Sequence, residues 1–224
     1  MSFSRNGFIY LGVSLIYLLV MLVVPSAEVW FKPMLMPALL IFYFLEAESA
    51  DRFLLRALLA CWAGDVLLML ENQSPVFFLS GLVVFLIGHV MYILSMRRLI
   101  RSDVDHGRPE FTLFIMVLVI AAAGTVWMLV REKAGDLLYP ITVYVIVIVS
   151  MFFHALRRRS RTTPESFWLM VFGALLFLIS DSLLALNRYY EKFPHAGAAV
   201  MITYLLAQYF LVSGALKHKA SPVV

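Results

Sequence analysis

Eight long apolar runs separated by short polar loops constrain the fold of this chain more than any other feature. They cover residues 7–24, 33–46, 51–70, 76–96, 111–130, 137–156, 165–186 and 196–216. A helix needs about 20 apolar residues to cross the hydrocarbon core of a bilayer, so 224 residues hold eight spans and no separate soluble domain. Charged residues make up only 14% of the chain, against about 25% in a soluble domain. The sequence therefore predicts an all-α, polytopic membrane bundle of eight transmembrane helices that forms one domain over residues 1–224.

The basic residues predict the orientation of this bundle. Cytoplasmic loops of membrane proteins are enriched in Lys and Arg, and thirteen of the 18 basic residues fall on one side of the predicted spans. Both termini are therefore expected in the cytoplasm. Because the basic clusters flank apolar spans, they are interpreted as topology signals, and no nucleic-acid partner is expected. The cytoplasmic set is Arg5, Arg52, Arg56, Arg97, Arg98, Arg101, Arg108, Arg157, Arg158, Arg159, Arg161, Lys217 and Lys219, and the outer set is Lys32, Arg131, Lys133, Arg188 and Lys192.

Two acidic residues lie inside apolar runs and share one local sequence. Asp65 stands in the segment GDVLLML and Asp181 in SDSLLAL. A carboxylate at mid-bilayer depth costs roughly 2.5–3.5 kcal/mol, so it persists where it has a partner, a water-filled cavity or a function. Each acid precedes its predicted helix end by five residues, about 7–8 Å along the axis. The match predicts a weak parallel repeat that relates helices 3–4 to helices 7–8, with both acids in the outer third of the bilayer.

Further polar side chains in the spans need an explanation. Each also has a structural interpretation: a buried histidine can be a packing residue, Asp181 can pair with Arg188, and Lys32 can extend to the interface. The sequence contains no His-x-x-x-His pair, Gly-x-Ser-x-Gly elbow or Gly-rich phosphate loop, so neither a metal nor another cofactor is expected. The predicted supporting polar network is His89, Tyr92, Tyr144, Asn187, Tyr204 and Gln208, and the predicted phosphate-binding residues are Lys32 and Arg188.

Five short segments, taken in order, resemble the YhhN-like family of lysoplasmalogenases. The resemblance covers nearly the whole chain and implies an eight-helix membrane enzyme. Such an enzyme cleaves the vinyl ether bond of a lysoplasmalogen, which is a lysophospholipid, to a fatty aldehyde and glycerophosphocholine or glycerophosphoethanolamine. The segments are Lys32-Pro33, Gly64-Asp65-x-x-Leu68, Gly88-His89-x-x-Tyr92, Ser180-Asp181-x-x-Leu184-Ala185-x-Asn187-Arg188 and Tyr204-x-x-Ala207-Gln208.

A pair of carboxyl groups suits this reaction. A vinyl ether hydrolyses when an acid protonates its carbon and water captures the resulting oxocarbenium ion. In a low-dielectric site, one carboxyl group can stay protonated as the donor while the other stays ionised, activates water and stabilises the cation. We therefore expect Asp65 and Asp181 to be the catalytic pair, in an order that the sequence does not assign.

Two other classes of function stay open. Paired acids and a parallel repeat also suit a small proton-coupled transporter, and a non-enzymatic lipid-binding protein can use the same polar residues. The short loops predict a multi-pass protein of a bacterial inner membrane. The sequence leaves open the headgroup preference, activity on ordinary lysophospholipids and the oligomeric state.

Overall fold

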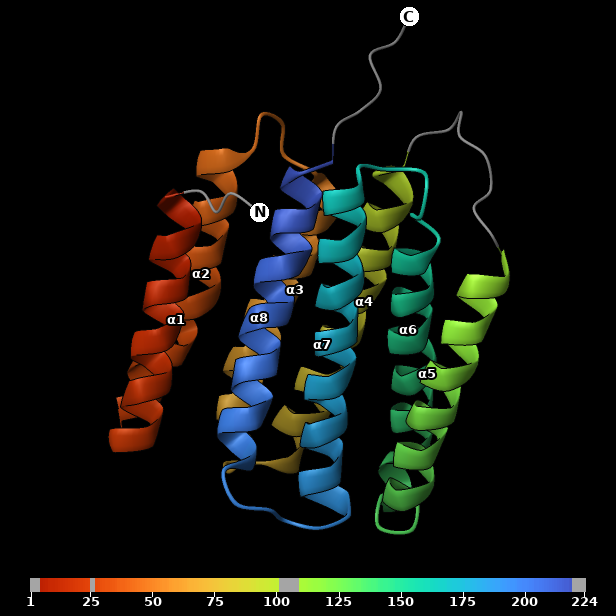
Figure 1. Cartoon of the computed structure of the whole chain (residues 1–224). Helices are drawn as coiled ribbons and strands as arrows, with labels where there is room; N and C mark the ends of the chain where they lie inside the picture. The colour runs from red at the N-terminus through yellow and green to blue at the C-terminus, as the bar shows by residue number, and fades with distance from the viewer. Residues whose placement is uncertain (1–4, 25–26, 101–108, 219–224) are drawn as a thin grey trace, which may run out of the picture. The chain divides into compact units, whose positions relative to one another are not determined.

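The chain is helical in a computed structural model that describes residues 5–24, 27–100 and 109–218 (Figure 1). Seven of the helices in these ranges are long and apolar enough to cross a membrane, which agrees with the predicted all-α, multi-pass protein. The topology residues Arg101, Arg108 and Lys219 lie outside the described ranges. The helices are α1 (Arg5–Val23), α2 (Glu28–Glu46), α3 (Arg52–Met69), α4 (Pro75–Arg98), α5 (Pro109–Val130), α6 (Leu138–Leu156), α7 (Pro164–Tyr189) and α8 (Ala196–Leu216), with a short 3-10 helix η2 (Gly135–Leu137) before α6.

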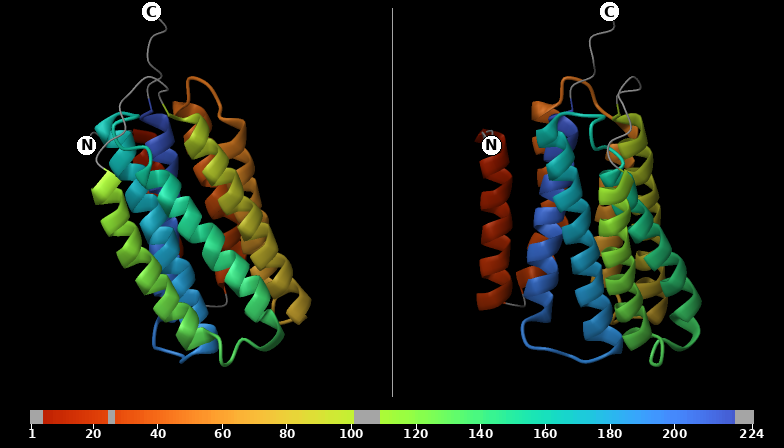
Figure 2. Two further views of the ribbon diagram at one scale, coloured as in Figure 1. Left: turned by 90° about the vertical axis from the view of Figure 1, so that its right-hand side faces the viewer. Right: turned by 45° about the vertical axis from the view of Figure 1, so that its right-hand side comes forward.

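The helices group into two compact units, Met1–Ser95 and Met96–Val224. In the first unit α2 packs against both α1 and α3. In the second unit α7 and α8 share the most extensive contact, while α5 and α6 pack against each other and against α7. The views in Figure 2 likewise show α7 and α8 side by side along their length. The predicted acids Asp65 and Asp181 therefore belong to different units.

Helix α2 is longer than its apolar run predicts. It begins at Glu28 rather than at residue 33, so Pro33 and Pro37 both lie inside it. Pro37 has no N–H to donate to the carbonyl of Pro33 four residues earlier. The indole Nε1 of Trp62 on α3 donates to that carbonyl at 2.9 Å. A side chain of the neighbouring helix thus replaces the backbone donor that Pro37 lacks, and α2 continues past this proline.

This replacement gives a testable effect on stability. We expect Trp62→Phe to lower the free energy of unfolding by about 1 kcal/mol, because the Pro33 carbonyl loses its donor. Trp168→Phe on α7 is the matched control, since Trp168 is also partly exposed and makes ring contacts without a hydrogen bond to a carbonyl. Thermal unfolding in detergent measures both variants. An equal fall in Tm for the two would contradict the role assigned to Trp62.

Two glycines allow α7 and α8 to approach closely. A Cβ atom at Gly173 would lie 2.9 Å from the backbone nitrogen of Leu211, and one at Gly214 would lie 3.1 Å from that of Met170. Small residues at such crossings permit backbone-to-backbone packing in membrane helices. The two glycines therefore position Asp181 on α7 relative to the polar residues of α8.

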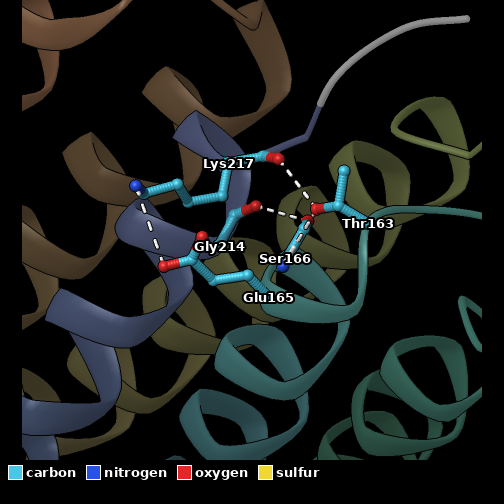
Figure 3. A network of polar contacts seen from close by, with 5 residues as sticks. All are labelled: Thr163, Glu165, Ser166, Gly214 and Lys217. Atoms are coloured by element: carbon cyan, nitrogen blue, oxygen red, sulfur yellow. Dashed lines mark hydrogen bonds and ion pairs between the residues drawn. The ribbon is translucent and has the colours of Figure 1, made fainter. Parts of the chain in front are cut away.

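Polar contacts join the start of α7 to the end of α8 (Figure 3). Ser166 Oγ donates to the Gly214 carbonyl at 2.6 Å, and Thr163 Oγ1 donates to the Lys217 carbonyl at 2.9 Å. Thr163 is also the N-cap of α7 and accepts from the Ser166 backbone N–H. Lys217 Nζ lies 3.7 Å from Glu165 Oε1. The first turn of α7 thus satisfies carbonyls that the last turn of α8 leaves without backbone donors.

One of the predicted topology charges is buried. Arg158, in the turn after α6, is fully enclosed. Its Nε donates to the Leu99 carbonyl at 3.2 Å and its Nη2 to Ser166 Oγ at 2.9 Å. Burial lowers the pKa of Arg158 to about 10, so the side chain is still protonated at neutral pH. Arg158 therefore connects the end of α4 to α7 within the second unit.

Candidate functional site

Asp65 is held at a tight contact between α3 and α4. Its side chain is only 5% exposed. The preceding residue, Gly64, lies against the ring of Phe85, where an added Cβ would be 2.6 Å from two ring carbons. Asp65 precedes the helix end at Met69 by four residues, about 6 Å along the axis. The Gly-Asp order in the motif therefore has a packing reason, because any larger residue before Asp65 would displace Phe85.

His89 is anchored by the same phenylalanine. Its Nδ1 lies 2.7 Å from the Phe85 carbonyl oxygen, and a carbonyl can only accept. Nδ1 therefore carries a hydrogen, and in the neutral ring Nε2 is an acceptor. His89 and Tyr92, one turn further along α4, are both buried, as expected for members of an interior polar network. Their functional roles stay predictions.

Helix α1 supplies polar residues that the sequence analysis missed. Tyr10 and Tyr17 are both buried. Tyr17 Oη also donates to Glu28 Oε1 at 2.8 Å. The spacing of Tyr10, Ser14 and Tyr17 at i, i+4 and i+7 was a usable signal, since it puts the three on one helix face.

Asp181 has a defined partner in the second unit. Tyr144 Oη on α6 donates to Asp181 Oδ2 at 2.7 Å. Asp181 is partly buried and Tyr144 is buried. Because α7 continues to Tyr189, Asp181 lies eight residues before the helix end, about 12 Å. The expected five-residue distance was therefore wrong for both acids, and they are not equally far from their helix ends.

The predicted residues of α8 face the interior of the second unit. Tyr204 and Gln208 are both buried. The Tyr204 ring packs edge-on against Phe177 of α7, with centroids 5.4 Å apart. Ser180, next to Asp181, donates from its Oγ to the Val200 carbonyl at 3.0 Å. These contacts fix α8 beside the helix that carries Asp181.

Asn187 and Arg188 lie in the last turn of α7. Asn187 Oδ1 accepts from the Phe193 backbone N–H at 3.3 Å, so it shapes the loop to α8. Arg188 is exposed, and its Cζ is 5.9 Å from the Tyr189 ring centroid. Lys32, the other predicted phosphate ligand, is partly buried near the start of α2.

The predicted site residues divide between the two units. Lys32, Asp65, His89 and Tyr92 belong to the first, and Tyr144, Asp181, Asn187, Arg188, Tyr204 and Gln208 belong to the second. Within the described ranges, no three His, Cys, Asp or Glu residues come together as a group that could hold a metal ion.

Comparison with known proteins gives a consistent set of relatives. A model of the YhhN family matches residues 27–215. The chain is 28% identical to human lysoplasmalogenase TMEM86B over 172 residues, which is 76% of this chain and 65% of the human protein. It is 31% identical to the pig TMEM86B protein over 178 residues, 77% of this chain and 69% of that protein.

A bacterial relative is similar to the same extent. The lysoplasmalogenase of Mycobacterium tuberculosis is 28% identical over 163 residues, 73% of this chain and 60% of that protein. This chain therefore spans just under two thirds of the length of the human and mycobacterial relatives that it matches. No solved structure matches it significantly.

Proposed function

The chain belongs to the YhhN family, and from this premise we propose that it is a lysoplasmalogenase. Its substrate is a lysoplasmalogen, and its products are a fatty aldehyde and a glycerophospho-base. The observation that carries the proposal is that the matched region, residues 27–215, contains both intramembrane acids and their polar partners. Asp65 and Asp181 are the proposed catalytic residues.

The proposed reaction needs one proton donor and one proton acceptor. A carboxyl group protonates the outer carbon of the vinyl ether double bond, and the ether oxygen shares the positive charge as an oxocarbenium ion. A carboxylate takes a proton from water as the water adds to the carbon next to that oxygen. The hemiacetal then collapses to aldehyde and alcohol. One water is consumed. The first carboxyl group loses one proton and the second gains one, so the protons balance.

The surroundings of each acid support this assignment. Tyr144 donates to one oxygen of Asp181, and a donor of this kind orients a carboxylate and suits its ionised form. Asp65 is nearly enclosed, beside the close approach of Gly64 to Phe85. Enclosure excludes bulk water, which would otherwise weaken electrostatic stabilisation of the cation. His89 and Gln208 are proposed to position water or carboxylates.

We propose that the substrate phosphate is bound by Lys32 or Arg188. Both are cations near the ends of apolar helices, where a lipid headgroup lies. We also propose a bacterial inner membrane location with both termini in the cytoplasm, which the uneven distribution of Lys and Arg supports.

Aldehyde release from purified protein in detergent tests the proposed function. The matched control substrate is the alkyl-ether lysolipid, which has no double bond to protonate. We expect aldehyde from the vinyl ether alone. If folded protein released none, the proposed enzyme would be wrong, and proton-coupled uptake into liposomes would be the next measurement.

The Tyr144 contact predicts a smaller and more specific effect. Tyr144→Phe removes the donor to Asp181, and we expect kcat to fall about tenfold with little change in KM, which corresponds to about 1.4 kcal/mol. Tyr139→Phe on the same helix is the matched control, because Tyr139 is 80% exposed. Unchanged kcat in folded Tyr144→Phe would remove Tyr144 from the site.

A further inference from the structure

One hydrogen bond joins α2 to α3 at the end of the first unit where α2 begins. Trp62 Nε1 on α3 donates to the Pro33 carbonyl on α2 at 2.9 Å. Only residues 47–51 separate these two packed helices, so they form a hairpin in which the start of α2 lies beside the end of α3. The bond therefore connects two segments that carry proposed site residues, Lys32 on α2 and Asp65 on α3.

Lys32 and Asp65 are equally far from the ends of their helices. Lys32 is four residues after the first residue of α2, Glu28, and Asp65 is four residues before the last residue of α3, Met69. Each is therefore about 6 Å along the axis from its helix end. The Trp62 bond fixes the register of these two ends, because it ties the carbonyl of the residue after Lys32 to a side chain three positions before Asp65. The two site residues are thus held at similar depth within one unit.

The Lys32 side chain is available to an anion. It is partly buried, and no carboxylate of the described residues forms an ion pair with it. A lysine in a membrane span either pairs with an anion or extends to the headgroups. The anion that a bound lysolipid brings to this depth is its phosphate.

The substrate requires its phosphate ligand and its acid to be held at a fixed separation. Six bonds separate the phosphorus from the vinyl ether carbon that water attacks, and a chain of six bonds spans at most about 7 Å. A misplacement of about 1 Å can reduce the rate about 100-fold. Lysine has a flexible four-carbon stem, so the fixed point must be its backbone. The bond from Trp62 to the neighbouring Pro33 carbonyl supplies such a point.

We propose that Trp62 is a positioning residue that holds Lys32 at the depth of Asp65, so that Lys32 binds the substrate phosphate while Asp65 acts on the vinyl ether. This inference rests on the proposed function and names Lys32 as the phosphate ligand. Trp62 itself touches neither the phosphate nor the reacting carbon. Without its bond, the α2 backbone beside Lys32 loses its hydrogen-bonded partner on α3, and the ammonium group is held less precisely.

Trp62→Phe tests the proposal through KM and kcat measured separately. A phosphate contact that is equally strong in the bound substrate and in the transition state affects KM and leaves kcat unchanged. We expect KM for the lysoplasmalogen to rise about threefold to tenfold in Trp62→Phe, and about tenfold to 100-fold in Lys32→Met, which loses the charge altogether. An unchanged KM in folded Trp62→Phe, or a fall in kcat alone, would overturn the positioning role.

The double variant distinguishes an effect through Lys32 from a general loosening of the first unit. If Trp62 acts by positioning Lys32, adding Trp62→Phe to Lys32→Met should raise KM no further, because the ligand to be positioned is gone. A purely structural role would give two effects on KM that multiply. Multiplied effects would therefore contradict the proposal.

A binding measurement on the wild-type protein stands even if a variant fails to fold. It compares two competitors that cannot be cleaved, the alkyl-ether lysolipid and the matching alkylglycerol, which lacks the phosphate and its base. We expect the lysolipid to inhibit at a concentration at least about tenfold lower, because only it has a phosphate for Lys32. This ratio should shrink in Trp62→Phe. Equal inhibition constants with the wild-type protein would overturn the proposal without any variant.

Trp168→Phe is the matched control. It makes the same exchange at a partly exposed tryptophan of the second unit, whose ring packs against Phe167 and Phe172, and it should keep the wild-type KM. An equal rise in KM for both tryptophan variants would also contradict the role of Trp62. The outcomes separate the two proposals. No aldehyde from folded wild-type protein overturns the lysoplasmalogenase function, whereas aldehyde release with an unchanged KM in Trp62→Phe overturns only the positioning role.

Discussion

Asp65→Asn and Asp181→Asn should each reduce aldehyde release at least about 100-fold. An amide has nearly the shape of the carboxyl group but neither donates an acidic proton nor accepts one from water. Positioned acid–base groups typically contribute 10²–10⁴-fold, so the expected loss is in kcat. For Asp181 the Tyr144 donor is still present, and an asparagine oxygen can accept from it, so the fold around α6 and α7 should survive.

The control for these variants is an acid outside the spans. Asp136→Asn changes an exposed aspartate in the short helix η2 and should retain wild-type activity. Size-exclusion chromatography and thermal unfolding in detergent establish that each variant is folded. Full activity in either folded intramembrane variant would contradict the catalytic role of that acid.

Gly173→Ala should produce the largest loss of stability among single methyl additions to the second unit. The new methyl group would lie 2.9 Å from the Leu211 backbone nitrogen and 3.1 Å from the Ala207 carbonyl oxygen. Backbone atoms cannot rotate away, so α7 and α8 must separate. Overpacking of this kind typically costs about 1–3 kcal/mol. Activity should fall as well, because the same helix pair carries Asp181 and Gln208.

Gly124→Ala on α5 tests the same chemical change without the clash. A Cβ at Gly124 has no atom within 4 Å, and alanine favours a helix over glycine by about 1 kcal/mol. This variant should unfold at the wild-type temperature or above it. If Gly173→Ala were as stable as Gly124→Ala, close packing of α7 on α8 would not be needed for stability.

The residues of the candidate site could be singled out only where they depend on local sequence. The repeated motif around Asp65 and Asp181 identified both acids, and helical spacing predicted the burial of His89 and Gln208, because burial of a helix face follows from spacing along one helix. The partner of Asp181 could not be assigned in this way. Tyr144 comes from another helix 37 positions away, and the distance between two side chains depends on how their helices pack.

The buried polar residues of α1, Tyr10, Ser14 and Tyr17, show the same limit of sequence-based prediction. Their spacing puts them on one helix face, but such a pattern does not say whether that face contacts water, lipid headgroups or polar residues of other helices. Only the packed first unit brings the Tyr17 hydroxyl to Glu28.

Apolar run length by itself determined that this chain is a multi-pass helical protein, and the motif residues singled out two acids within apolar runs, because bilayer thickness and the cost of a buried charge apply whatever the packing. The tertiary structure decided that α2 continues through Pro37 and that Arg158 is buried. In both cases the reason is a hydrogen-bonding partner on another segment: Trp62 supplies a donor to the Pro33 carbonyl, and the Leu99 carbonyl and Ser166 hydroxyl accept from Arg158.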